Sequence, residues 1–168
     1  MRKIGFLGCC LAALLACGCA AIYSSLMEDS PLVLAYADDQ GIKSQSEVAT
    51  LAINKDYGLW LNGEEINKFG GGINPDLRVS KNLAGKSTIL VDVLPGAYRV
   101  AVMGSVTQSG GGITYTTTEP AEQTYTFQAG KIYSIELFVA GISGSVLIRE
   151  MSAGVYDTVA NNRSRAVF

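Results

Sequence analysis

Residues 122–128 read Glu-Gln-Thr-Tyr-Thr-Phe-Gln, the most regular stretch of the chain. Gln123, Tyr125 and Phe127 alternate there with the more polar Glu122, the threonines and Gln128. A period of two is typical of a strand with one buried face, because successive side chains of a strand point to opposite sides of the sheet. The stretch therefore predicts a half-buried strand with its aromatic side chains turned toward a core.

Similar alternation extends outward from this stretch along most of the chain. Ala129-Gly130 predicts a turn, and the next strand places Tyr133, Ile135, Leu137 and Val139 on one face. Further strands are expected at Glu47–Ile53, Leu59–Leu61, Glu64–Ile66, Lys86–Val93, Ala97–Gly104 and Ser145–Glu150. Asn62-Gly63 and Pro95-Gly96 supply turn residues between them. We expect an all-β fold, an antiparallel β-sandwich of about seven to nine strands.

The composition limits the chemistry more than the fold. The chain has 168 residues, enough for one domain, and it contains no histidine. Ser-His-Asp and Cys-His nucleophile pairs and two-histidine zinc sites are therefore excluded. We expect a protein that is not an enzyme and that needs no cofactor and no metal.

The first residues have the organisation of a secretory signal peptide. Arg2 and Lys3 are followed by an uncharged, mostly apolar run from Ile4 to Ala16. The run ends in Leu14-Leu15-Ala16-Cys17, which resembles the lipobox of bacterial lipoproteins. The resemblance implies that Cys17 becomes the mature N-terminus and carries a diacylglycerol on its sulfur.

An uncleaved signal anchor is the alternative, since no charge occurs between Ile4 and Met27. Both alternatives tether the domain to a membrane. The expected organisation is a signal peptide at 1–16, a lipidated N-terminus and tether at 17–45, a β-sandwich domain at 46–152 and a flexible polar tail at 153–168. The apolar run at 31–37 is compatible with either a strand or a short helix.

Cysteine usage and charge indicate where the domain functions. All four cysteines lie within the first 19 residues, so the domain beyond them has neither disulfides nor thiolate chemistry. Loss of Arg2 and Lys3 with the leader leaves 11 basic against 15 acidic residues, a net charge of −4. This sign disfavours binding to nucleic acid through bulk charge.

Three segments together resemble the small prealbumin-like and PEGA-type sandwich domains of bacterial lipoproteins. They are Asn62-Gly63 after a strand, Leu94–Val100, and Phe127–Tyr133. The PEGA signature itself is represented only by Pro95-Gly96-Ala97. The resemblance covers about Val48 to Val139, and it implies a β-sandwich in a non-catalytic envelope protein rather than any particular activity.

Several motifs give only weak evidence for a phosphate, calcium or catalytic site. The Gly-rich segments Gly70–Ile73 and Gly110–Ile113 lack the strand, helix and lysine of a phosphate-binding loop, so we expect hairpin tips. Asp38-Asp39 has oxygen ligands for calcium without the EF-hand spacing. Adjacent carboxylates such as Glu64-Glu65 point to opposite faces of a strand, which disfavours a glycosidase-type pair.

Trp60 is the best candidate for a side chain that contacts a partner. It alternates with Leu59 and Leu61, so its indole is expected either to be exposed or to meet the second sheet. An exposed indole there would anchor an envelope protein or a glycan. The Thr-rich hairpin at Ile113–Thr118 offers an edge for strand addition.

We expect a lipid-anchored lipoprotein of the bacterial cell envelope that binds or scaffolds, held through Cys17. Gly18 after the lipidated cysteine favours the outer membrane, facing the periplasm. A surface adhesin or envelope-assembly subunit is the alternative, and a histidine-independent carboxylate enzyme is a third.

Overall fold

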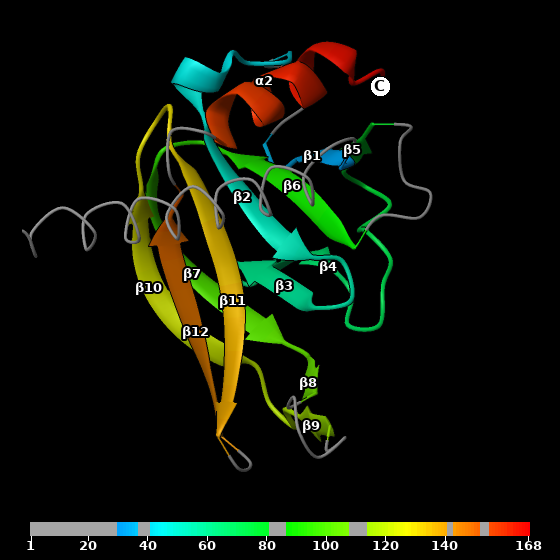
Figure 1. Ribbon diagram of the computed structural model, residues 1–168, viewed down its shortest axis with the longest axis vertical. Helices are drawn as coiled ribbons and strands as arrows, with labels where there is room; N and C mark the ends of the chain where they lie inside the picture. Colours follow the sequence, from blue (N-terminus) through cyan, green and yellow to red (C-terminus); the bar gives the residue numbers. More distant parts are fainter. Residues whose placement is uncertain (1–29, 37–40, 81–86, 108–113, 141–142, 152–154) are drawn as a thin grey trace, which may run out of the picture.

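The computed structural model describes residues 30–36, 41–80, 87–107, 114–140, 143–151 and 155–168 (Figure 1). The described chain is mostly β. The strands are β1 (Leu32–Leu34), β2 (Ala49–Asn54), β3 (Gly58–Leu61), β4 (Glu64–Asn67), β5 (Arg78–Val79), β6 (Thr88–Val93), β7 (Gly96–Met103), β8 (Ser105–Thr107), β9 (Thr114–Thr116), β10 (Ala121–Phe127), β11 (Ile132–Ala140) and β12 (Ser143–Glu150). The helical elements are the 3-10 helix η2 (Gln45–Glu47) and the α-helix α2 (Tyr156–Arg165).

These strands form three sheets. The six-stranded sheet has the order β12-β11-β2-β6-β1-β5, the four-stranded sheet β10-β7-β3-β4, and β8 pairs with β9. The expectation of purely antiparallel sheets is wrong at two places, because β1 runs parallel to β6 and β11 runs parallel to β2. The expectation of seven to nine strands is also too low for the described residues. Short strands such as β1, β5, β8 and β9 do not have enough residues to show an alternating pattern.

One apolar core lies between the six-stranded and four-stranded sheets. Val91 and Ile135 from the first sheet and Leu59 and Val100 from the second belong to a single cluster of buried side chains. The expected inner faces are confirmed, since Tyr133, Ile135, Leu137 and Val139 all enter this cluster. Burial of these faces is the main stabilising contribution to the fold.

An aromatic group closes one end of the core. The Phe127 ring lies 5.7 Å from that of Tyr98 and 5.1 Å from those of Tyr125 and Tyr133, measured between centroids. These are distances at which tilted aromatic rings attract one another. Phe127 and Tyr133 are buried in the core cluster, and Tyr98 and Tyr125 pack against it. The aromatic faces expected for the strands around 122–128 and 131–139 are therefore confirmed.

The turn that follows Phe127 carries the chain from one sheet to the other. The strands expected around 122–128 and 131–139 are confirmed as β10 and β11, which belong to different sheets. Gly130 adopts a positive φ of 76°, and the Gln128 backbone N–H donates to the Tyr133 hydroxyl at 3.1 Å. Tyr133 therefore holds the corner at which the chain crosses the core.

The predicted Asn62-Gly63 hairpin is present between β3 and β4. Asn62 has a φ of 54° and Gly63 a φ of 89°, as the tight turn requires. The Asn62 side-chain oxygen accepts the Arg99 backbone N–H at 2.9 Å, which joins the turn to β7.

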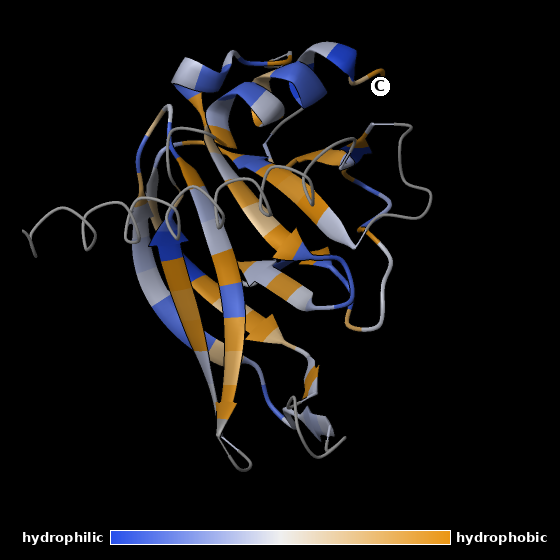
Figure 2. Cartoon of the chain, in the orientation of Figure 1, coloured by the Kyte–Doolittle hydropathy of each residue, from blue (hydrophilic) through white to orange (hydrophobic). Residues whose placement is uncertain are grey.

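The expected flexible tail is wrong for residues 156–165, which form α2 on the other face of the six-stranded sheet (Figure 1). Val155 and Val159 pack there against Leu90 and Ile132, in a second cluster of buried side chains. Figure 2 shows why the helix was missed, because α2 is mostly hydrophilic and has few apolar side chains to mark a buried face.

The expected limits of the domain are too narrow at the N-terminal side as well. Part of the 31–37 run is a strand, β1, and its three residues are buried between β5 and β6. The sheet therefore begins within the segment that was assigned to the tether.

Candidate functional site

The structure places Trp60 on the face of the four-stranded sheet that points away from the core. Its neighbours Leu59 and Leu61 are buried in the core, whereas Trp60 is half-buried. The indole lies over Gly58, where an added Cβ would come within 2.6 Å of the ring. Glycine at position 58 therefore provides the space that the Trp60 ring occupies.

The other expected site residue, Cys17, lies outside the described residues, as do Asp38-Asp39 and the loop Gly110–Ile113. The neighbouring β9 strand pairs with β8 in a partly exposed two-stranded sheet, whose Val106 and Tyr115 pack against the main core. Within the part of the chain that the structure describes, no helix has the length and apolarity needed to cross a bilayer. No three acidic side chains cluster as metal ligands among the same residues.

A cavity of about 500 Å³ is the strongest candidate site. Strands β10 and β12 contact each other at one side of the molecule, on the left in Figure 1. The six-stranded sheet has two more strands than the four-stranded sheet, so β1 and β5 extend beyond β4 at the opposite side. The cavity lies there, where the segment between β4 and β5 covers the sheet in place of a strand.

The cavity has an apolar part and a polar part. The apolar side chains are Pro31, Ile73, Pro75, Leu77, Val79 and Ile89. The remaining lining residues are Lys55, Asp56, Asn67, Gly70, Gly71, Gly72 and Asn74. The volume lies within the range of about 300 to 1,000 Å³ that is usual for small-molecule pockets, whereas the lining is more polar than that of most such pockets.

The Gly-rich segment expected to be a hairpin tip forms one wall of this cavity. Gly70, Gly71 and Gly72 all have positive φ, from 85° to 120°, a conformation that side chains other than glycine rarely adopt. Gly70 N–H donates to the Asp56 carbonyl at 3.0 Å, and Lys68 N–H donates to the Gly72 carbonyl at 2.8 Å. The wall is therefore hydrogen-bonded in place.

Asn67 is the polar group with the most unusual surroundings. Its side-chain Nδ2 donates to the Lys55 carbonyl at 2.6 Å and to the Tyr57 carbonyl at 2.5 Å. These two acceptors identify the nitrogen end of the amide, and the other end is the acceptor Oδ1. Oδ1 is buried and has no hydrogen-bond partner among the described residues. A buried acceptor left unpaired costs about 1 to 3 kcal/mol.

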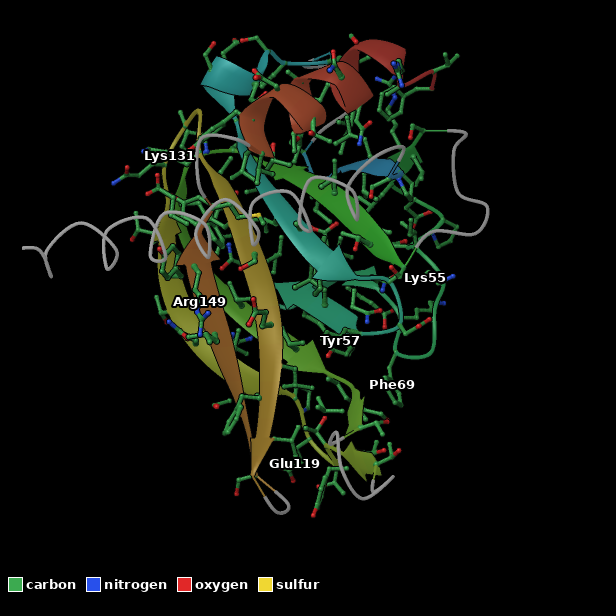
Figure 3. All side chains as sticks on the ribbon, viewed as in Figure 1. Lys55, Tyr57, Phe69, Glu119, Lys131 and Arg149 are labelled. Carbon is green, nitrogen blue, oxygen red and sulfur yellow. The ribbon has the colours of Figure 1, made fainter. Side chains whose placement is uncertain are left out.

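The charged groups of the cavity lie at its surface. Lys55 is half-exposed and Asp56 is exposed, and they carry opposite charges. Figure 3 shows Lys55 on the same side of the molecule as Phe69, which directly precedes the Gly-rich wall and is 41% exposed. Because Lys55 and Asp56 carry opposite charges, their side chains together add no net charge to the cavity.

A second cavity of about 360 Å³ adjoins the first through Leu77. Glu64 and Asp76 line it together with Arg78 and Tyr36. Both carboxylates are exposed to solvent. A carboxyl group that acts as the general acid of a glycosidase is usually buried in apolar surroundings, which keep it protonated. Glu64 and Asp76 lack such surroundings.

A buried charge pair lies beneath α2. Arg163 Nη1 donates to Asp92 Oδ2, and Thr50 Oγ1 donates to Asp92 Oδ1 at 2.8 Å. Burial raises the pKa of the Asp92 carboxyl, against the opposing effects of Arg163 and Thr50. The pair also ties α2 to the segment before β2, because Arg163 Nη2 donates to the Lys43 carbonyl. Its place between a helix and a sheet indicates a structural role.

Sequence reasoning did not find the cavity. Asn67 gave no signal, because an asparagine at the end of a short strand is ordinary in loops and turns. Comparison with protein-family models, with curated proteins and with solved structures found no match to this chain.

Proposed function

We propose that this protein is a lipid-anchored binding module of the bacterial cell envelope, which takes a small ligand into the cavity beneath the Gly-rich wall and is not an enzyme. The observation that carries the binding role is the cavity of about 500 Å³, whose lining combines apolar side chains such as Leu77 and Ile89 with the polar side chains of Lys55 and Asn74. The lipobox-like sequence at Leu14–Cys17 supports the anchor.

The finer description of the fold belongs to the same proposal. Two sheets that share one core support a β-sandwich, and we assign it to the prealbumin-like type that the turn motifs resemble. In this proposal, the parallel pairing of β1 with β6 and that of β11 with β2 are departures from a purely antiparallel sandwich. Gly18 after Cys17 supports the outer membrane, with the domain facing the periplasm.

The anchor and the cavity are close along the chain. Pro31 lines the cavity, and it follows Cys17 by 14 residues. At about 3.5 Å per residue these can span at most about 50 Å. A cavity held within this distance of a bilayer would meet ligands that partition into or leave the membrane.

Replacing Cys17 by alanine is expected to release the protein from the membrane. Two or three acyl chains anchor a protein almost permanently, since each buried methylene contributes about 0.8 kcal/mol. Cys17→Ala should lose metabolic labelling by an alkyne palmitate and move to the soluble fraction after cell lysis. Cys19→Ala is the matched control, and it should stay labelled and membrane-bound. A labelled, membrane-bound Cys17→Ala protein, or a mature protein with its leader intact, would contradict the anchor.

A surface adhesin or assembly subunit is the second candidate function. The half-buried Trp60 on the outer face of the four-stranded sheet and the partly exposed strands β8 and β9 favour it, because both present surface to a large partner. Protease treatment of intact cells distinguishes the two functions. A domain that faces the periplasm should survive the treatment, whereas an adhesin should be cleaved.

A further inference from the structure

We infer that the domain docks on the surface of the bilayer through an apolar patch formed by Trp60, Phe69 and Met103, which holds the cavity next to the lipid. This inference rests on the lipid anchor of the proposed function and adds the surface of the domain that contacts the membrane.

The three residues of the apolar patch gather around Gly58. The position of a Cβ added to Gly58 is 2.6 Å from the Trp60 ring and 3.2 Å from the Phe69 backbone nitrogen, so the ring lies beside Phe69. Met103 is the partner of Gly58 on the neighbouring strand β7. Trp60 and Met103 are half-buried, and Phe69 is 41% exposed. Together they present apolar surface on β3 and β7 and beside the end of β4.

The chain that leads from the anchor enters the domain close to this patch. The described chain begins at Ser30, and the next residue, Pro31, lines the cavity. The Gly-rich wall of the same cavity follows Phe69 directly in the sequence. A tether of at most about 50 Å that ends at the cavity favours orientations in which this side of the domain faces the bilayer.

The composition of the patch suits a neutral lipid surface. Tryptophan is enriched at membrane interfaces, because its ring is apolar while its N–H stays in contact with water. Lys55 and Lys68 lie close to the patch in the sequence. Their charges are offset by Asp56 and by Glu65, which pairs with Trp60 across the strands. The surroundings therefore have no excess of positive charge, and we expect docking on phosphatidylcholine without anionic lipid.

The anchor allows so small a patch to be sufficient. Three partly exposed side chains would bind a bilayer weakly by themselves, because the affinity increases with the apolar area that is buried. A tether that already holds the domain at the membrane makes docking an intramolecular event with a high effective concentration. The lipidated protein is therefore the form in which docking is expected.

Trp60 is the single tryptophan of the chain, so its fluorescence reports on docking. The full-length lipidated protein is reconstituted into phosphatidylcholine vesicles whose acyl chains carry bromine near the headgroup, and into vesicles without bromine. Bromine quenches tryptophan at short range, so we expect about twofold lower emission in the brominated vesicles, since interfacial indole rings lie at the level of the headgroups. High salt should leave this ratio unchanged, because docking does not depend on charge.

Phe69→Ser should remove most of the quenching. Phe138→Ser is the matched control, since it changes a ring that is 63% exposed on the other sheet, and it should leave the quenching unchanged. Both positions are exposed, so both variants should fold. Full quenching in Phe69→Ser, or loss of quenching in Phe138→Ser alone, would overturn docking through this patch. Unquenched Trp60 in pure phosphatidylcholine vesicles would overturn it as well, and shielding of the ring in native membranes would then point to a protein partner.

Mass spectrometry of the same reconstituted sample separates this inference from the proposed function. A protein that carries acyl chains on Cys17 and shows no quenching would overturn the docking and leave the anchor standing. A protein without acyl chains would overturn both.

Discussion

Replacing Arg163 by methionine is expected to lower the free energy of unfolding by about 3 to 5 kcal/mol, because it leaves the buried Asp92 carboxylate without its counter-charge. Asp92 is fully buried, and the Arg163 side chain is only 8% exposed. The substitution also leaves the Lys43 carbonyl without the Nη2 donor. Urea unfolding of the full chain in detergent should show a lower midpoint at an unchanged slope.

Two further variants distinguish the effect of leaving Asp92 unpaired from a general disruption of α2. Adding Asp92→Asn to Arg163→Met removes the stranded charge, so the double variant should regain part of the lost stability. Lys131→Met breaks the exposed pair with Glu150 and should change stability very little. Equal losses in Arg163→Met and Lys131→Met would contradict a special role for the buried pair.

The Arg163→Met penalty should also depend on pH. Removing Arg163 takes away an interaction that lowers the Asp92 pKa, so the folded-state pKa of Asp92 rises further above its unfolded value. A carboxyl group whose pKa is higher in the folded state than in the unfolded state stabilises the fold fully at pH values below the unfolded-state pKa. This stabilisation is lost as the pH rises through the folded-state pKa. The stability difference from the unaltered protein should therefore be largest at neutral pH and shrink on acidification.

The local part of the fold could be predicted from the sequence because it depends on neighbours along the chain. The alternation at Tyr125 and Phe127 fixes which face of β10 is buried, and Asn62-Gly63 fixes a turn. Each of these signals needs only a few residues. They identified most of the longer strands and the aromatic part of the core.

Pairing between distant strands and the position of α2 could not be predicted in this way. Nothing near β1 indicates that Leu32–Leu34 will run parallel to β6, about sixty residues later. Helix α2 buries few apolar side chains and is held partly by Arg163, whose partner Asp92 is remote in sequence. The cavity depends on the same long-range arrangement, since β1, β4 and β5 come together only in the folded sheets.

Phe127→Ala is the second substitution with a large expected effect. Phe127 is 1% exposed and sits among the rings of Tyr98, Tyr125 and Tyr133. Truncation removes both the buried ring and its aromatic contacts and leaves a cavity, which typically costs about 3 to 5 kcal/mol. The same urea unfolding measurement gives the loss.

Phe138→Ala provides the matched control, since it deletes the same ring from the solvent face of β11. Phe138 is 63% exposed, so its removal should alter stability by no more than about 0.5 kcal/mol. A large difference between the two variants would locate the stabilising core between the two sheets, at the corner that Tyr133 holds. Similar losses at both positions would mean that the aromatic group contributes no more than an exposed side chain, and the packing of the two sheets described above would be wrong.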